Sequence, residues 1–293
     1  ECVELNFQTC IRRSAYLMDL LFDYYTLKQY DVLKLEGSIN FDPLNSMQLK
    51  GKKLAKEEVM EMAKKIVLSG ARLPFYRVIG VNAVSHNNAG AFAAQELGYA
   101  LAWGNEYLSS LIELDVDKSL AAKKIKFNFG VGGNYFMEIA KFRAAKWLWA
   151  LIVEAYQPAC RRDNCELTRD GICYCAMKMR LHAETSAFNK TIYDAHVNLL
   201  RTQTEAMSAS LGGVNSLSVL PFDAPFKAGD DFSERIARNQ QLLLKEESNF
   251  DKITDPAGGS YYIETLTKEL AAQAWKIFLE IEDKGRFFAA IED

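Results

Sequence analysis

The feature that most constrains the fold is a regular alternation of strand-like and helix-like segments. Apolar residues recur at helical spacing at residues 11–27, 56–68, 88–114, 135–156, 193–211 and 233–247, and a last helix begins near Thr265. Strand-like runs lie at residues 32–41, 76–81, 125–131, 177–184, 217–222 and 251–255. Because each of these six strands is followed by a helix, the pattern favours a parallel sheet covered by helices.

The length of the chain leaves two arrangements of that sheet open. A complete barrel of eight βα units takes about 250 residues, whereas six units already occupy the 293 residues of this chain. The alternation therefore permits an open doubly wound sheet or part of a closed barrel. Residues 159–176 interrupt the alternation with clustered Cys, Arg and Asp, and we interpret them as an insertion.

Composition and charge exclude several classes of protein. The chain is 49% hydrophobic and 25% charged, with a formal net charge of −3. It thus lacks the basic surface that nucleic acid or anionic lipid requires, and we expect no nucleic-acid or membrane partner. The longest apolar stretch, residues 147–153, is far shorter than the ~20 residues of a membrane helix. The chain begins at Glu1 without a recognisable signal peptide, so we expect a longer natural N-terminus and a cytoplasmic protein.

Four of the six cysteines form a candidate metal site, namely Cys160, Cys165, Cys173 and Cys175. Two thiolate pairs on one loop are suited to tetrahedral zinc. The match to zinc spacing is loose, because four residues separate the first pair and one separates the second. The cluster therefore predicts a structural zinc site, with a loop of reduced thiols as the alternative.

Two further features carry less chemistry. Gly130, Gly132 and Gly133 follow a predicted strand, but the dinucleotide fingerprint needs a further glycine where this chain has Tyr135, which favours a tight turn. His182 lies within a predicted strand and points into either a pore or a core.

Several longer stretches resemble the adenosylcobalamin-dependent acyl-CoA mutases, of which methylmalonyl-CoA mutase is the type. In chain order they are residues 95–99 (Gln-Glu-Leu-Gly-Tyr), 137–144 (Met-Glu-Ile-Ala-Lys-Phe-Arg-Ala), 198–202 (Asn-Leu-Leu-Arg-Thr), 205–207, 233–239 and 255–261. The resemblance implies a (β/α)8 TIM-type barrel with acyl-CoA along its axis. It further implies that residues 1–293 are a C-terminal portion of about six βα units, from near the third strand to the eighth helix, without the separate cobalamin-binding domain.

The departures from this family fall on its catalytic residues. Alignment on Ala89-Gly90 places Val84 and Ser85 where catalytic members carry the Tyr-His pair that holds the substrate, and His86 comes one position late. Further along, His182 matches the family, but Glu184 replaces a glutamine and would repel an anionic substrate carboxylate. The resemblance therefore implies that this chain has no catalytic residue and no substrate-binding residue.

These departures resemble the small chain of the heterodimeric mutases. The resemblance implies a non-catalytic chain that supports a methylmalonyl-CoA mutase large subunit, which would carry the adenosylcobalamin and interconvert succinyl-CoA and methylmalonyl-CoA. Apart from the predicted zinc, we expect no cofactor on this chain. Two alternatives stay open: an active mutase in which His86 supplies the imidazole, and a metal-binding interaction module that uses residues 159–176 of a decayed barrel.

Overall fold

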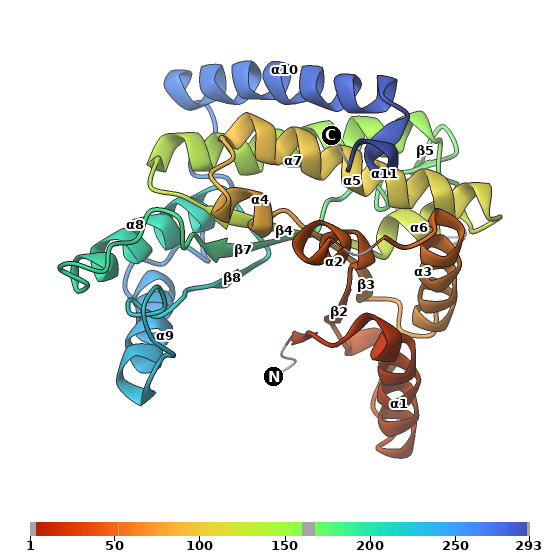
Figure 1. The fold of residues 1–293 in the computed structure, drawn as a ribbon, viewed down its shortest axis with the longest axis horizontal. Helices are drawn as coiled ribbons and strands as arrows, with labels where there is room; N and C mark the ends of the chain where they lie inside the picture. Colours follow the sequence, from red (N-terminus) through yellow and green to blue (C-terminus); the bar gives the residue numbers. More distant parts are fainter. Residues whose placement is uncertain (1–3, 52, 160–167, 292–293) are drawn as a thin grey trace.

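The structure, a computed structural model, describes residues 4–51, 53–159 and 168–291. Within these ranges, six strands form one parallel sheet in the order β1 (Leu5–Phe7), β2 (Gly37–Phe41), β3 (Tyr76–Asn82), β4 (Ile125–Val131), β7 (Leu181–Thr185) and β8 (Ser216–Ser218). Each new strand joins the same growing edge, so the strand order lacks the reversal that defines a doubly wound sheet. The sheet curls into a half-barrel (Figure 1), which confirms the predicted partial barrel of the TIM type.

The helices cover the convex side of this sheet and its two ends. The longer ones are α1 (Ser14–Leu27), α3 (Lys56–Gly70), α5 (Ala93–Glu113), α7 (Tyr135–Ala155), α8 (Val197–Leu211), α9 (Asp231–Glu246) and α10 (Tyr261–Asp283). Shorter helices are α2 (Pro43–Lys50), α4 (Val84–Asn88), α6 (Lys118–Lys123) and α11 (Arg286–Ala290). In Figure 1, α10 lies across α5 and α7, while α1 and α9 extend from opposite ends of the sheet.

Strand β4 shows how the sequence pattern builds two different faces. All seven of its residues are buried, and they alternate in direction. Phe127 and Phe129 face the helices, where the Phe127 ring meets Trp149 edge-on at 4.7 Å between centroids. A Cβ on Gly104 of α5 would lie 2.5 Å from Phe127 Cζ, so a glycine here allows α5 to approach the sheet. The intervening polar residues of β4 face the concave side.

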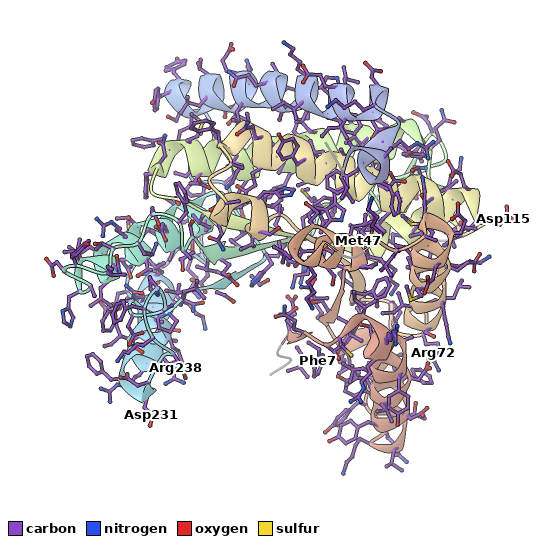
Figure 2. The ribbon with its side chains drawn as sticks, in the orientation of Figure 1. Phe7, Met47, Arg72, Asp115, Asp231 and Arg238 are labelled. Carbon is purple, nitrogen blue, oxygen red and sulfur yellow. The ribbon has the colours of Figure 1, made fainter. Side chains whose placement is uncertain are left out.

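Helices α1 and α3 form one end of the half-barrel. Arg72 follows α3, and its guanidinium lies 4.5 Å from the centre of the Phe22 ring and bonds Asp19, both on α1. Figure 2 shows Arg72 beside these two helices, far from Asp231 and Arg238 on α9. The two ends of the sheet therefore carry separate helical extensions.

Several predicted boundaries are wrong. Residues 251–255 are a turn rather than a strand, because Asn249 and Asp255 take positive φ angles of 54° and 48° that a strand cannot contain. The sheet still has six strands among the described residues, because β1 near the N-terminus, which sequence analysis missed, takes part in it. The predicted helix 88–114 begins too early, because α4 ends at Asn88, the chain turns at Gly90 with a φ of 94°, and α5 begins only at Ala93.

Other elements are shorter than predicted. The segment at 32–41 contains β2, and the segments at 177–184 and 217–222 overlap β7 and β8, of which β8 already ends at Ser218. Within the interrupting segment, the described residues form a small antiparallel hairpin of β5 (Thr168–Arg169) and β6 (Ile172–Cys173).

Candidate functional site

The concave face of the half-barrel holds a cavity of about 740 Å³. Polar side chains from the strands line its floor, and residues of α2 and α4 line it at the carboxyl ends of β2 and β3. Catalytic residues of TIM-type barrels come from the carboxyl ends of the strands. This cavity is therefore the candidate functional site.

Three asparagines on adjacent strands occupy the middle of the floor. Asn40 Nδ2 donates to Asn82 Oδ1 at 2.7 Å, and Asn128 Nδ2 donates to Asn82 Oδ1 at 2.7 Å and to Asn40 Oδ1 at 3.1 Å. The neighbouring Gly80 makes room for this contact, since a Cβ there would lie 1.8 Å from Asn40 Oδ1. The amides thus bond one another and form the middle of the cavity floor.

Asp42 anchors this amide cluster at the end of β2. Its carboxylate accepts bonds from Asn82 N at 3.0 Å, Asn82 Nδ2 at 2.7 Å and the Tyr107 hydroxyl at 2.9 Å. It also caps α2 by accepting from Asn45 N at 3.2 Å. Burial raises the pKa of Asp42 to about 7 despite these bonds, because removal from water penalises the charged form.

Lys126 lies on β4, two residues before Asn128, on the same face of the sheet. Its Nζ donates to Asn6 Oδ1 at 2.7 Å and to Ser38 Oγ at 3.1 Å, which ties β4 to β1 and β2. Burial lowers the pKa of Lys126 to about 8. This cation is therefore held by the protein's own oxygens.

His182 and Glu184 both line the cavity, where sequence analysis left the direction of His182 open. The His182 Nδ1 lies 2.9 Å from Ser216 Oγ on the neighbouring strand. Burial, together with the charge of Lys126, lowers the pKa of His182 to about 4, so the imidazole is neutral near pH 7. Burial raises the pKa of Glu184.

The residues at the family's Tyr-His positions lie on α4. Val84 and Ser85 both line the cavity at the carboxyl end of β3. Val84 brings only hydrocarbon, and Ser85 Oγ donates to the backbone oxygen of Asn82 at 2.9 Å.

His86 occupies a different environment from its two neighbours. Its Nε2 lies 2.6 Å from Gln48 Oε1, and its ring packs against Tyr99 and Trp103 at centroid distances of 5.4 and 5.7 Å. It does not line the cavity, and burial lowers its pKa. This placement gives no support to the alternative in which His86 supplies a catalytic imidazole.

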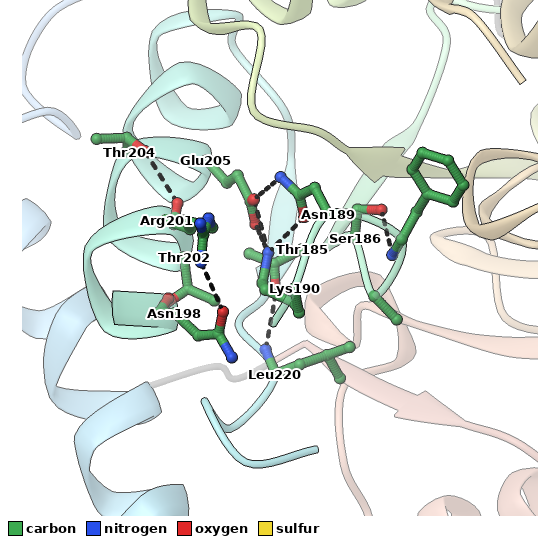
Figure 3. A network of polar contacts seen from close by, with 12 residues as sticks. Thr185, Ser186, Asn189, Lys190, Asn198, Arg201, Thr202, Thr204, Glu205 and Leu220 are labelled. Carbon is green, nitrogen blue, oxygen red and sulfur yellow. Dashed lines mark hydrogen bonds and ion pairs between the residues drawn. The ribbon is translucent and has the colours of Figure 1, made fainter. Parts of the chain in front are cut away.

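The loop after β7 is fixed to α8 by a buried polar network (Figure 3). Glu205 accepts from Lys190 Nζ at 2.6 Å and from Asn189 Nδ2 at 2.7 Å. Asn198 donates to the backbone oxygens of Thr191 at 2.8 Å and Phe222 at 2.9 Å. The matched stretch around residues 198–205 therefore holds loops in place at the carboxyl ends of β7 and β8.

The predicted zinc site is only partly described. Cys160 and Cys165 lie outside the described residues, and the four-cysteine site stays a prediction. Cys173 Sγ and Cys175 Sγ lie 2.8 Å apart, at the opposite end of β4 from the mouth of the cavity. Among the described residues, no group of three or more His, Cys, Asp or Glu side chains is placed to hold a metal ion.

Sequence analysis missed the asparagine cluster and Asp42. A signal was available, because Asn is rare in strands, yet Asn40, Asn82 and Asn128 lie in or at the end of consecutive predicted strands. Asp42 precedes Pro43 and can be identified from sequence as a helix cap. Its contact with Tyr107 joins residues 65 positions apart and has no local signal.

Comparison with known proteins now identifies the family. The family model described as methylmalonyl-CoA mutase matches residues 9–293. The methylmalonyl-CoA mutase small subunit of Porphyromonas gingivalis is 50% identical over 290 residues, which cover 99% of this chain and 45% of that protein. The small subunit of Streptomyces virginiae is 39% identical over 258 residues, covering 88% of this chain and 39% of that protein.

A large subunit is also related to this chain. That of Porphyromonas gingivalis is 37% identical over 220 residues, covering 75% of this chain and 29% of the large subunit. The chain spans less than half the length of these relatives. In the described part of the chain, every helix is too short or too polar to cross a membrane. The match over residues 9–293 shows that this chain belongs to the methylmalonyl-CoA mutase family.

Proposed function

We propose that this chain is part of the small subunit of a heterodimeric methylmalonyl-CoA mutase. In this role it does not catalyse the interconversion of succinyl-CoA and methylmalonyl-CoA, and it supports the large subunit that does. The similarity to small subunits over nearly the whole chain supports this assignment. A relative named as the large subunit in the same organism, Porphyromonas gingivalis, supports the choice of partner.

The observation that carries the non-catalytic role is the pair Val84 and Ser85 at the mouth of the cavity. In catalytic members, a Tyr-His pair at these positions holds the substrate by hydrogen bonds. Val84 cannot form such bonds, and the Ser85 hydroxyl is engaged by the Asn82 backbone. The bonded amides of Asn40, Asn82 and Asn128 line the floor of the same cavity.

The same argument indicates which subunit binds the cofactor. The residues at the cavity mouth do not fit the family's radical chemistry, so we assign adenosylcobalamin to the large subunit and derive no step through it here. We also place the chain in the cytoplasm.

Native mass spectrometry of the full-length chain mixed with the large subunit tests the proposal. We expect a heterodimer with one cobalamin, and we expect the cobalamin to stay with the large subunit when the complex is dissociated in the gas phase. A homodimer of this chain that carries cobalamin and acyl-CoA would overturn the proposal.

Turnover measurements on the full-length chain provide a second test. The chain alone, supplied with adenosylcobalamin and succinyl-CoA, should form no methylmalonyl-CoA. The double variant Val84→Tyr, Ser85→His should stay inactive, because Glu184 still lines the cavity and would repel an anionic substrate carboxylate. Turnover by the wild-type chain alone would contradict a supporting role.

A further inference from the structure

Cys173 and Cys175 form a close thiol pair remote from the cavity. Cys173 ends β6, and Cys175 lies in the turn that follows, closed by a bond from Ala176 N to Cys173 O at 3.0 Å. The two Sγ atoms are 2.8 Å apart. Residues two apart in such a turn have Cα atoms within the span of roughly 4.4–6.8 Å that a disulfide requires.

The two thiols differ in their access to solvent. Cys173 is fully buried, and its Sγ lies 3.4 Å from Lys123 Nζ and 3.8 Å from Ser119 Oγ on α6. Cys175 is partly exposed and also interacts with Lys123. A soluble oxidant can therefore reach Cys175 first. Cys173 lies beside Cys175, and the Lys123 ammonium group is next to both thiols.

We propose that Cys173 and Cys175 form a reversible dithiol–disulfide site that exchanges with low-molecular-weight disulfides of the glutathione type. The site requires no other cysteine. It lies beside the amino end of β4, whereas the cavity mouth lies at the carboxyl ends of the strands. Oxidation should therefore leave the concave face unchanged.

The exchange takes place in two balanced steps. The Cys175 thiol releases its proton to water, and the thiolate attacks one sulfur of the disulfide, which forms a mixed disulfide and expels one thiolate that takes up a proton. The Cys173 thiol then loses its proton, and its sulfur attacks Cys175 Sγ and expels the second small thiol. Two electrons pass from the protein dithiol to the small disulfide, which is reduced to two thiols.

The burial of the two sulfurs sets the expected rates of the two exchange steps. Cys175 is only partly exposed, so the first step should be slower than reaction of the exposed Cys10. The second step is intramolecular between sulfurs already in contact and should follow rapidly.

Redox titration of the full-length chain with mixtures of reduced and oxidised glutathione tests the proposal. Samples are quenched with acid, alkylated with N-ethylmaleimide and digested with trypsin. Cleavage after Arg169 and Lys178 gives a peptide that contains Cys173 and Cys175 and excludes Cys160 and Cys165. We expect this peptide to lose both alkylation sites together and to lose two hydrogens, reversibly with dithiothreitol, while Cys10 stops at the mixed glutathione disulfide.

Single variants separate the two steps. Cys173→Ser should stop at a mixed disulfide on Cys175, whereas Cys175→Ser should react at least about tenfold more slowly because the remaining thiol is buried. Lys123→Met should slow the first step about threefold or more, and Lys123→Arg should restore it.

Three results would overturn the proposal. The first is alkylation of both thiols at equilibrium in the most oxidising glutathione mixture. The second is a disulfide that joins either cysteine to Cys160 or Cys165. The third is stoichiometric zinc in the same sample that protects both thiols from oxidised glutathione, which would favour the predicted metal site instead.

Discussion

At the scale of single residues, Asp42 makes the stability of the fold depend on pH. Its pKa is about 7 in the folded chain, raised by burial from the ordinary 3.8. Between these values the folded state holds a proton that the unfolded state has lost. The stabilising contribution is therefore complete below about pH 4 and is lost as the pH rises through about 7. At roughly 1.4 kcal/mol per pKa unit, protonation of this single group changes the free energy of unfolding by about 4 kcal/mol across this pH range.

The Asp42→Asn variant isolates this effect. We expect the free energy of urea unfolding of the wild type to fall more steeply between about pH 4.5 and about pH 7.5 than that of the variant. The difference between the two slopes is the readout, because the amide also leaves the Asn82 donors poorly matched and lowers stability at every pH. Equal slopes would show that Asp42 is ionised throughout this range.

Gly80 gives a second prediction at the residue scale. An alanine Cβ at this position would collide with Asn40 Oδ1 and break the bonds of the asparagine cluster. Gly80→Ala should lower the free energy of unfolding by about 2 kcal/mol or more. Gly133→Ala is the control, since its Cβ would lie 3.1 Å from the end of the Asn189 side chain. In an Asn40→Ala background the cost of Gly80→Ala should shrink by at least about 1 kcal/mol, and full additivity would exclude the collision as the cause.

At the scale of secondary-structure elements, Lys141 joins α5, α7 and β4. Its Nζ bonds Glu96 Oε2 at 2.7 Å, Glu138 Oε2 at 2.5 Å and the Gly130 backbone oxygen at 2.8 Å, and the Lys141 and Glu96 side chains are fully buried. Removing the ammonium group would leave two carboxylates without their counter-ion in the core. Lys141→Met should therefore cost about 3–5 kcal/mol in urea unfolding of the full-length chain. Lys276→Met, which removes an exposed pair with Glu280, should change stability by less than about 0.5 kcal/mol, and similar costs for both variants would refute this role.

The same scale shows which elements the sequence pattern could predict. Strand β4 was recognisable because Phe127, Phe129 and their neighbours form a fully buried run. Strand β1 was missed because its three residues are largely exposed and its position depends on pairing with β2 through contacts such as Leu5 with Gly37. Residues 251–255 have a strand-like composition, but turn geometry at Asn249 and Asp255 prevails over it.

The candidate site divides in the same way. Alignment with family motifs singled out Val84 and Ser85, and both residues line the cavity. The direction of the His86 side chain could not be predicted from the sequence. Its contact with Gln48 and its packing between aromatic rings depend on how α2 and α5 meet. Tertiary contacts of this kind leave no periodic signal in the sequence.

At the scale of the whole molecule, the half-barrel keeps its curvature through contacts across the concave side. Arg180, which precedes β7, bonds Glu4 at 2.9 Å and Glu36 at 2.8 Å, which precede β1 and β2. Lys126 makes a parallel connection from β4 to Asn6. These contacts span the arc of the sheet and direct polar side chains toward one another rather than toward a ligand. Such contacts agree with the supporting role that we propose for this chain.

The same organisation makes a prediction about the heterodimer that we propose. If the chemistry belongs to the large subunit, truncating the side chains at the mouth of this cavity should not affect turnover. The double variant Val84→Ala, Ser85→Ala removes two methyl groups and one hydroxyl whose bond is to the Asn82 backbone, so the fold should tolerate it. We expect the reconstituted complex to convert succinyl-CoA at the wild-type rate within a factor of about two, a difference of about 0.4 kcal/mol in the barrier. Native mass spectrometry of the same sample confirms that the heterodimer is intact. A loss of more than about tenfold in an intact complex would mean that this cavity takes part in catalysis after all.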